Sequence, residues 1–597
     1  MPFGAAVERG GVRFRLWAPA EARVDLVLEP SGDRLSMDGV GDGWHELYTE
    51  AARPGTRYRF ELGNGMRIPD PASRFQPDDV HGASEVIDPT AYVWSDGAWR
   101  GRPWHEAVLY EAHVGTYTPE GTFAALIAKL DHLAALGVTG LELMPIADFP
   151  GRRNWGYDGV LWFAPDAAYG RPEELKALVD AAHARGLMVL LDVVYNHFGP
   201  EGNYLPAYAP QLFTARHKTP WGNAVNFDGP GSATVRALVI ENALYWLEEF
   251  HFDGLRLDAV HAIVDDGPRH VLEELAARVR EACGERHVHL VLENGDNEAR
   301  FLRRDDDGRP LRYDAQWNDD LHHGLHAAAT GERSGYYAEY FGDTAKLARA
   351  FAEGFAFQGE TMHYVGRPRG EPSADLPPTA FIAFIQNHDQ VGNRAFGDRL
   401  SAALGPEALR AIAAAYLLCP QIPLLFMGEE WAAPEPFPFF CDFGPELAQA
   451  VRDGRREEFA QFQEFQDPDA RERIPDPTAE ETFRSAKLDW TRIATEPHAG
   501  WLDWYRRILR VRRAELVPRL AGAPGGTGEH ATLAPGVLEA RWRLADDSRL
   551  TLRAVLRPEP FDGFEPASGR VLWREGADVS ADAAAPWSVL WLLAGGR

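Results

Sequence analysis

The first part of the chain, residues 1–95, carries short runs in which every second residue is apolar. Such runs occur at residues 11–17, 23–28 and 58–62, and the last is closed by Gly63, Asn64 and Gly65. Alternation with period two, punctuated by turn-forming residues, is typical of antiparallel strands with one buried face. We therefore expect an N-terminal immunoglobulin-like β-sandwich over residues 1–95.

Over residues 96–517 the pattern changes to apolar runs alternating with longer amphipathic segments, such as residues 171–185 and 234–250. The apolar runs number eight and lie at residues 108–117, 140–144, 187–195, 254–260, 287–293, 313–317, 381–386 and 422–427. Eight such units predict an α/β domain, a (β/α)8 TIM barrel with insertions. A doubly wound sheet is the alternative, but no glycine-rich phosphate loop follows the first run.

The C-terminal part follows a predicted helix at residues 501–516 and a glycine-rich stretch at 522–528. Beyond it, residues 537–544, 550–556 and 570–573 have the composition of strands. We expect a small C-terminal β domain, a β-sandwich, over residues 518–597.

Composition narrows the class of function. Of 597 residues, 61 are Lys or Arg and 89 are Asp or Glu, which gives a net charge of -28. This field repels phosphate backbones and anionic lipid, so we expect no nucleic-acid partner and no membrane partner. Three unevenly spaced cysteines, no signal peptide and no apolar stretch long enough for a membrane span predict a cytoplasmic protein.

Candidate chemistry lies where four of the predicted strands end. The third ends near Asp192 and His197, the fourth in Arg256 and Asp258, the fifth in Glu293 and the seventh before His388 and Asp389. A single Asp at such a position is equally well explained as a surface charge. Active sites of these barrels are built at the carboxyl ends of the strands, so four such ends together predict one site.

Paired carboxylates, an arginine and an aromatic-rich composition point to glycoside chemistry. Arg256 and Asp258 are two residues apart on a strand and therefore face the same side, where the arginine keeps the carboxylate ionised. Glu293 follows a run of apolar residues, and desolvation there would favour the protonated carboxyl that a general acid requires. The alternative is a salt bridge that serves packing alone.

These strand ends, together with residues 140–146, resemble the signature segments of the α-amylase family of glycoside hydrolases and follow one another in that family's order. The resemblance implies that Asp258 is the nucleophile, Glu293 the general acid/base and Asp389 a ligand of the sugar hydroxyls. The residues that it places around the sugar whose bond is cleaved are Tyr157, Asp192, His197, Arg256 and His388. It also implies retention of configuration at the anomeric carbon.

Many members of that family bind calcium near the residue that corresponds to Asn196. No acidic loop of calcium type lies beside Asn196 here, so we expect no required metal and no cofactor. Residues 305–308 resemble a cation loop, but a solvated turn explains them better.

Within the family, residues 196–204, 331–337, 384–394 and 426–432 are most similar to the malto-oligosyltrehalose trehalohydrolases. This similarity implies a malto-oligosyltrehalose substrate, release of trehalose, and malto-oligosyltrehalose synthase as the pathway partner. Trp221, in the loop 217–223, is the candidate platform for the leaving disaccharide, although a ring that simply covers the barrel fits equally well. Glycogen branching or debranching enzymes, and a non-catalytic carbohydrate-binding relative, are the alternatives.

Overall fold

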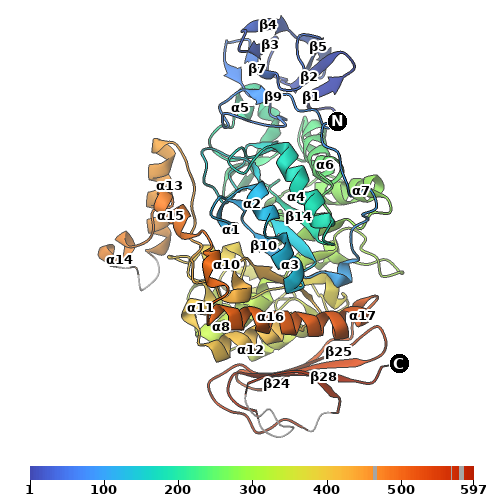
Figure 1. Ribbon diagram of the computed structural model, residues 1–597, viewed down its shortest axis with the longest axis vertical. Helices are drawn as coiled ribbons and strands as arrows, with labels where there is room; N and C mark the ends of the chain where they lie inside the picture. Colours follow the sequence, from blue (N-terminus) through green and yellow to red (C-terminus); the bar gives the residue numbers. More distant parts are fainter. Residues whose placement is uncertain (461–464, 466, 566–567, 577–583, 597) are drawn as a thin grey trace.

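The computed structural model describes residues 1–460, 465, 467–565, 568–576 and 584–596 (Figure 1). The chain forms a small β domain at its N-terminal end, a central barrel surrounded by helices, and a β-sheet at its C-terminal end. Across this described part of the chain, no helix is long and apolar enough to cross a membrane.

The N-terminal domain consists of two antiparallel sheets in residues 1–95, all of which are described. One sheet has the strand order β1-β2-β6-β5 and the other β4-β3-β7-β8, with β9 also paired to β7. In β2, Val12, Phe14 and Leu16 are buried while the residues between them are partly exposed, as the alternation predicts. The strands are β1 Gly4–Glu8, β2 Gly11–Trp17, β3 Val24–Glu29, β4 Asp33–Ser36, β5 Asp38–Gly41, β6 Trp44–Thr49, β7 Arg57–Leu62, β8 Arg67–Ile68 and β9 Ser84–Glu85.

The centre of the described chain is a closed barrel of eight parallel strands, which confirms the predicted fold class. Each of the eight apolar runs contains one of these strands. They are β10 Leu109–Ala112, β11 Gly140–Leu143, β14 Met188–Val193, β17 Gly254–Leu257, β18 His289–Leu292, β19 Ala315–Trp317, β22 Phe381–Ala383 and β23 Ile422–Phe426. The first predicted strand was too long, because residues 114–117 turn into the short helix α1 (Val114–Tyr117). Two small hairpins leave the rim, β12 Ala147–Asp148 with β13 Leu161–Pro165 and β15 Phe213–Thr219 with β16 Gly222–Val225.

Helices cover the outside of the barrel (Figure 1). Apolar side chains fill its inside. The interior cluster includes Leu109, Leu190, Val291 and Trp317 from four different strands, and Phe384, which directly follows β22. Such a filled interior means that ligands meet the barrel at its rim. The helices are α2 Phe123–Ile127, α3 Leu130–Leu136, α4 Pro172–His183, α5 Leu205–Tyr208, α6 Ser232–Glu249, α7 Val271–Cys283, α8 Asp319–Thr330, α9 Thr344–Glu353, α10 His388–Gly392, α11 Leu400–Ala403, α12 Pro406–Leu417, α13 Pro445–Phe459, α14 Pro468–Glu472, α15 Glu480–Ser485, α16 His498–Val511 and α17 Val517–Leu520.

The predicted helix at residues 501–516 is interrupted near its end. The α-helix α16 gives way to a π-helical turn over Arg512–Leu516. The Arg512 guanidinium is buried and donates to the carbonyl oxygens of Leu417, Cys419 and Gln421, which satisfies the free carbonyls that follow α12.

The C-terminal strands form a five-stranded antiparallel sheet in the described residues, with the order β24-β25-β26-β28-β27. A β-sandwich was predicted here, but these strands form one sheet that is seated against the barrel helices. Trp591 Nε1 donates to the Ala414 carbonyl of α12 at 2.9 Å, and the Gly536 N–H donates to Thr344 of α9. The strands are β24 Glu529–Ala534, β25 Val537–Arg543, β26 Arg549–Val555, β27 Arg570–Glu575 and β28 Ser588–Ala594.

Candidate active site

Arg256 is the centre of the candidate site and links three of the predicted carboxylates. Its Nη1 donates to Asp192 Oδ2 and to Asp258 Oδ1, both at 2.8 Å, and its Nη2 lies 3.0 Å from Glu293 Oε2. The side chain is fully buried, and its guanidinium carbon lies 4.1 Å from the centre of the Trp317 ring. One cation therefore holds together carboxylates at the carboxyl ends of β14, β17 and β18.

Asp258 follows β17 directly, and both of its oxygens have donors. Arg256 occupies Oδ1, as their two-residue spacing on one strand predicts, and Asn196 Nδ2 donates to Oδ2 at 3.0 Å. These two contacts fix the plane of the carboxylate. The residue is 8% exposed, so this fixed group still has access to the space above the barrel rim.

Glu293 is not the desolvated carboxyl that the preceding apolar run predicts. Its side chain is 18% exposed, and Oε2 accepts from the Ala259 N–H at 2.8 Å as well as facing Arg256. The apolar residues before it lie within β18, below the level of the carboxyl group. Ala259 has φ +39°, a conformation that is costly for a residue with a Cβ. This strain directs its N–H at Glu293.

His388 begins α10 and is paired with Glu111, a residue of β10 that the sequence reasoning missed. Glu111 Oε1 lies 2.5 Å from His388 Nδ1, and Oε2 accepts the His388 backbone N–H at 2.9 Å. Burial disfavours the charged imidazole, but Glu111 and Asp389 outweigh it and raise the pKa of His388 to about 9. His388 is therefore positively charged at neutral pH. The signal for Glu111 was a charged residue inside an apolar strand rather than at its end.

A second buried acid, Glu142 of β11, was also missed. It is 1% exposed, and neither carboxyl oxygen has a hydrogen-bond partner among the described residues. Burial, reinforced by Glu111 and Asp192, raises its pKa well above the ordinary value. Its surroundings thus favour the protonated, uncharged form of the carboxyl group.

We predict that Glu111→Gln lowers stability in a pH-dependent way. The folded-state pKa of His388, about 9, lies above the ordinary 6.5, so its stabilisation is complete below pH 6.5 and is lost as the pH rises through 9. The variant should therefore be less stable than the wild type by about 3 kcal/mol at pH 6, and the difference should shrink towards pH 9. Urea unfolding at pH 6, 7.5 and 9 measures this, with the surface-pair variant Asp131→Asn as control. A difference that does not change with pH would contradict the assignment.

Tyr157 and Asp192 form one side of the site. The Tyr157 hydroxyl donates to Asp192 Oδ2 at 2.7 Å, and its ring stacks on His388 with 5.0 Å between centroids. Burial raises the pKa of Asp192 to about 7, although Arg256 opposes it. Tyr157 is thereby held in a fixed orientation beside the candidate nucleophile.

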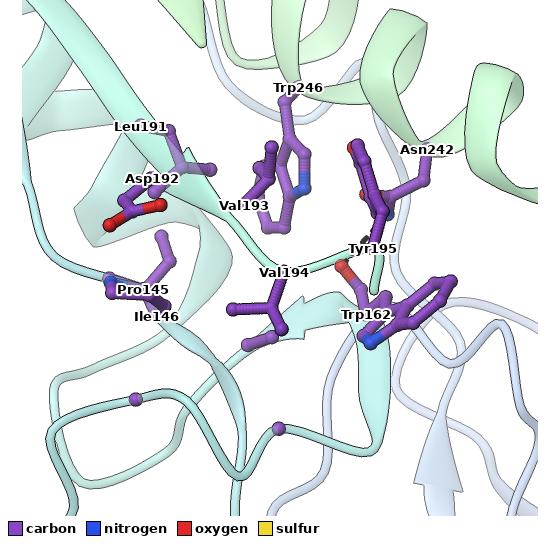
Figure 2. A pocket seen from close by; sticks show the side chains of 13 residues that line it. Pro145, Ile146, Trp162, Leu191, Asp192, Val193, Val194, Tyr195, Asn242 and Trp246 are labelled. Atoms are coloured by element: carbon purple, nitrogen blue, oxygen red, sulfur yellow. Dashed lines mark hydrogen bonds between the residues drawn. The ribbon is translucent and has the colours of Figure 1, made fainter. Parts of the chain in front are cut away.

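Close packing supports the strand that carries Asp192. Figure 2 shows the cavity behind the end of β14, which has a volume of about 20 Å³. Trp162 and Trp246 enter it from β13 and α6, and Asn242 accepts a hydrogen bond from the Tyr195 hydroxyl at 2.8 Å. The space is comparable to that of one water, so little room is left for this strand end to shift.

Asp389 is the second residue of α10 and the most open of the three candidate catalytic carboxylates. Its side chain is 34% exposed, with His388 Nε2 at 3.5 Å and Asn393 Nδ2 donating to Oδ1 at 3.2 Å. The second carboxyl oxygen thus remains available to a ligand at the rim.

Trp221 lies at the tip of the β15–β16 hairpin and stacks on His197. The ring centroids are 4.4 Å apart and the planes are within 4° of parallel. His197 Nε2 also lies 2.9 Å from the Tyr157 carbonyl. Trp221 is 49% exposed and, with His197, lines a cleft of about 730 Å³. The exposed ring thus lies at the cleft, next to a residue of the candidate site.

Three places in the described chain have side chains that a cation could contact. Asn196 contacts Asp258 through Nδ2, and its Oδ1 lies 2.5 Å from His197 Nδ1. Residues 305–308 form an exposed turn in which Asp305 accepts backbone N–H groups. In the described residues, the three-residue group with ligand-like spacing is His217, Asp228 and Asp266. Arg216, 3.1 Å from Asp228, already supplies a positive charge there.

Comparison with known proteins agrees with this architecture. Residues 59–211 match the alpha-amylase catalytic domain, residues 2–89 match carbohydrate-binding module 48 (isoamylase N-terminal domain), and residues 525–591 match a domain of unknown function, DUF3459. A crystal structure of a Salmonella typhimurium protein described as an alpha amylase is 46% identical, with a TM-score of 0.95 over 99% of both chains. The fold and the site thus define a glycoside hydrolase of the α-amylase class.

Proteins of similar sequence show to which family within this class the chain belongs. The malto-oligosyltrehalose trehalohydrolase of Arthrobacter ramosus is 46% identical over 508 residues, which is 84% of this chain and 87% of that protein. A 1,4-alpha-glucan branching enzyme of Dechloromonas aromatica is 35% identical over 290 residues, 44% of this chain and 46% of that protein. The chain belongs to the malto-oligosyltrehalose trehalohydrolase family.

Proposed function

We propose that this enzyme hydrolyses the α-1,4-glucosidic bond next to the terminal trehalosyl unit of malto-oligosyltrehalose and releases trehalose. The observation that carries the proposal is the 46% identity to a trehalohydrolase over 84% of the chain. The retained set of Asp258, Glu293 and Asp389 around Arg256 supports it. A non-catalytic relative would have no need of this set.

The site geometry suggests how each group acts. The Asp258 carboxylate, oriented by Arg256 and Asn196, attacks the anomeric carbon and forms a glycosyl–enzyme ester. Glu293 gives its proton to the departing glycosidic oxygen, so the trehalose leaves neutral. It then takes a proton from water, and the oxygen of that water replaces Asp258 at the anomeric carbon. Two displacements at one carbon retain the configuration.

Other residues of the site hold the sugar in place. The charged His388 and the Asp389 carboxylate bind its hydroxyls, and the Tyr157 ring packs on its face. Arg256 stays positive throughout and balances the two carboxylates as charge moves between them. Asp192 fixes both Arg256 and Tyr157.

Product analysis tests the substrate. Purified protein incubated with maltotriosyl trehalose should release trehalose and maltotriose rapidly and cleave maltopentaose slowly. New α-1,6 branches, or linear chains released from glycogen without trehalose, would favour a branching or debranching activity instead. Absence of product from all three substrates would favour the non-catalytic alternative.

We predict that Trp221→Ala selectively impairs the trehalosyl substrate. An exposed indole stacked on His197 offers a rigid apolar face to a sugar ring, and the bent leaving disaccharide depends on it more than a linear glucan does. The ratio kcat/KM for maltotriosyl trehalose should fall roughly tenfold or more, and less for maltopentaose. Phe341→Ala, which removes an aromatic ring 45% exposed outside the site, is the control. Equal losses on both substrates would overturn the platform role.

We further propose that the substrate is supplied by malto-oligosyltrehalose synthase, because some enzyme must convert the reducing end of a glucan into a trehalosyl unit. We also propose a cytoplasmic location. Among the described residues, Cys283, Cys419 and Cys441 are free, as in proteins of a reducing compartment.

A further inference from the structure

Asp319 is a half-buried acidic residue at the barrel rim to which the proposed function assigns no role. It is the first residue of α8 and follows β19, so it stands at the carboxyl end of the sixth barrel strand. Within the described residues it accepts one hydrogen bond, from Gln390 Nε2 at 3.4 Å, which is long for such a bond. An ionised carboxylate offers about four acceptor sites, so most of them are free.

Gln390, the hydrogen-bond donor to Asp319, carries a second polar atom without a hydrogen-bond partner. Its Oε1 is buried and has no hydrogen-bond partner among the described residues. Buried polar atoms in folded proteins nearly always have partners. Asp319 and Gln390, from α8 and α10, therefore present acceptor oxygens that a ligand with several hydroxyl groups would satisfy.

The charges around Asp319 place it in the candidate active site. Burial, together with the charges of Glu293 and Asp389, raises the pKa of Asp319 to about 7, and Arg369 opposes them. Glu293 is the neighbour with the strongest charge effect. Asp319 thus shares its surroundings with the acid/base candidate, which has to reach the oxygen between the two sugars.

Tyr336 is the third residue of this group, after Asp319 and Gln390. Burial raises its pKa to about 12; a hydrogen bond with Tyr337 opposes this rise, and the charges of Asp389 and Asp319 add to it. Its ring lies edge-on to Tyr364, with 5.9 Å between centroids, and Tyr364 is 57% exposed. Tyr336 belongs to residues 331–337, a string that pointed to the trehalohydrolases but has no role in the mechanism above.

We propose that Asp319, together with Gln390 and Tyr336, binds hydroxyl groups of the sugar on the leaving side of the scissile bond and thereby helps to select the leaving disaccharide. The inference rests on the proposed function. Tyr157 and Asp192, which the proposed function places at the sugar whose bond is cleaved, make no hydrogen bond to Asp319 in the described chain.

Selection follows from the cost of unpaired groups. A leaving sugar whose hydroxyls fit satisfies Asp319 and Gln390, whereas one that does not fit leaves buried polar atoms unpaired. Asp319 is in this sense a specificity-determining residue.

Product inhibition tests the inference on the full-length enzyme. Trehalose is a probe for the leaving side and maltotriose for the glucan side, each measured as an inhibition constant against maltotriosyl trehalose. In Asp319→Ala the constant for trehalose should rise at least about tenfold and that for maltotriose less than about twofold. Asp319→Asn, which keeps one acceptor oxygen, should fall between the wild type and Asp319→Ala. Asp307→Asn makes the same charge change at an exposed turn and should behave like the wild type.

The outcomes separate this inference from the proposed function. If the wild-type enzyme releases trehalose but both inhibition constants rise together in Asp319→Ala, Asp319 supports the site only structurally and the inference is wrong. An unchanged constant for trehalose would also overturn it. If the wild type releases no trehalose, the proposed function itself fails, and the inference fails with it.

Discussion

Asp258→Ala is expected to lower turnover of maltotriosyl trehalose by roughly 10⁴-fold or more, equivalent to about 5.5 kcal/mol of transition-state stabilisation. Without this carboxylate the anomeric carbon has no nucleophile held in place by Arg256 and Asn196. The fold should survive, because Arg256 retains Asp192 and Glu293 as partners.

Steady-state turnover together with thermal unfolding measures both parts of this prediction. Asp266→Ala, which removes a carboxylate 67% exposed outside the site, serves as the matched control and should keep normal activity. Activity of Asp258→Ala within tenfold of the wild type would exclude Asp258 as the nucleophile.

Glu293→Gln is expected to lower turnover of the same substrate by about 10³-fold, within the range that general acid catalysis contributes. The amide keeps the size of the side chain but cannot give a proton to the leaving oxygen. A fluoride leaving group needs no such proton. In the first step, Glu293→Gln should therefore lose far less activity on α-maltotriosyl fluoride than on maltotriosyl trehalose.

Asp258→Ala provides the contrast, because it should lose activity on both substrates. Fluoride release in a single-turnover experiment isolates the first step from hydrolysis of the intermediate. Equal losses of Glu293→Gln on the two substrates would mean that Glu293 does not act as the acid, even if it is needed for activity.

The barrel was readable from the sequence because its strands are continuous apolar runs, the pattern of strands buried on both faces. The residues around Arg256 were readable for a related reason. A charged residue that follows a buried strand, as Asp258 follows β17, has to lie where solvent reaches it. The carboxyl ends of all strands of a parallel barrel lie on one face, so such residues come together there.

Residues inside strands were missed because their partners lie far away in the chain. Glu111 meets His388 across 277 positions, and no local pattern reports that contact. Asp319 begins a helix, where an acid has an ordinary explanation as a helix-terminus charge. The environment of Glu293 was misjudged since neighbours in sequence are not its neighbours in space.

Local residue order thus determined where strands and helices form and which side chains stand at the strand ends, because burial and backbone geometry act over a few residues. Tertiary structure alone decided which distant groups meet: that Arg256, besides its predicted pairing with Asp258, bridges Asp192 and Glu293, that Glu111 keeps His388 positive, and that Trp221 stacks on His197. Electrostatic and stacking interactions depend on distance in space, and closure of the barrel sets those distances.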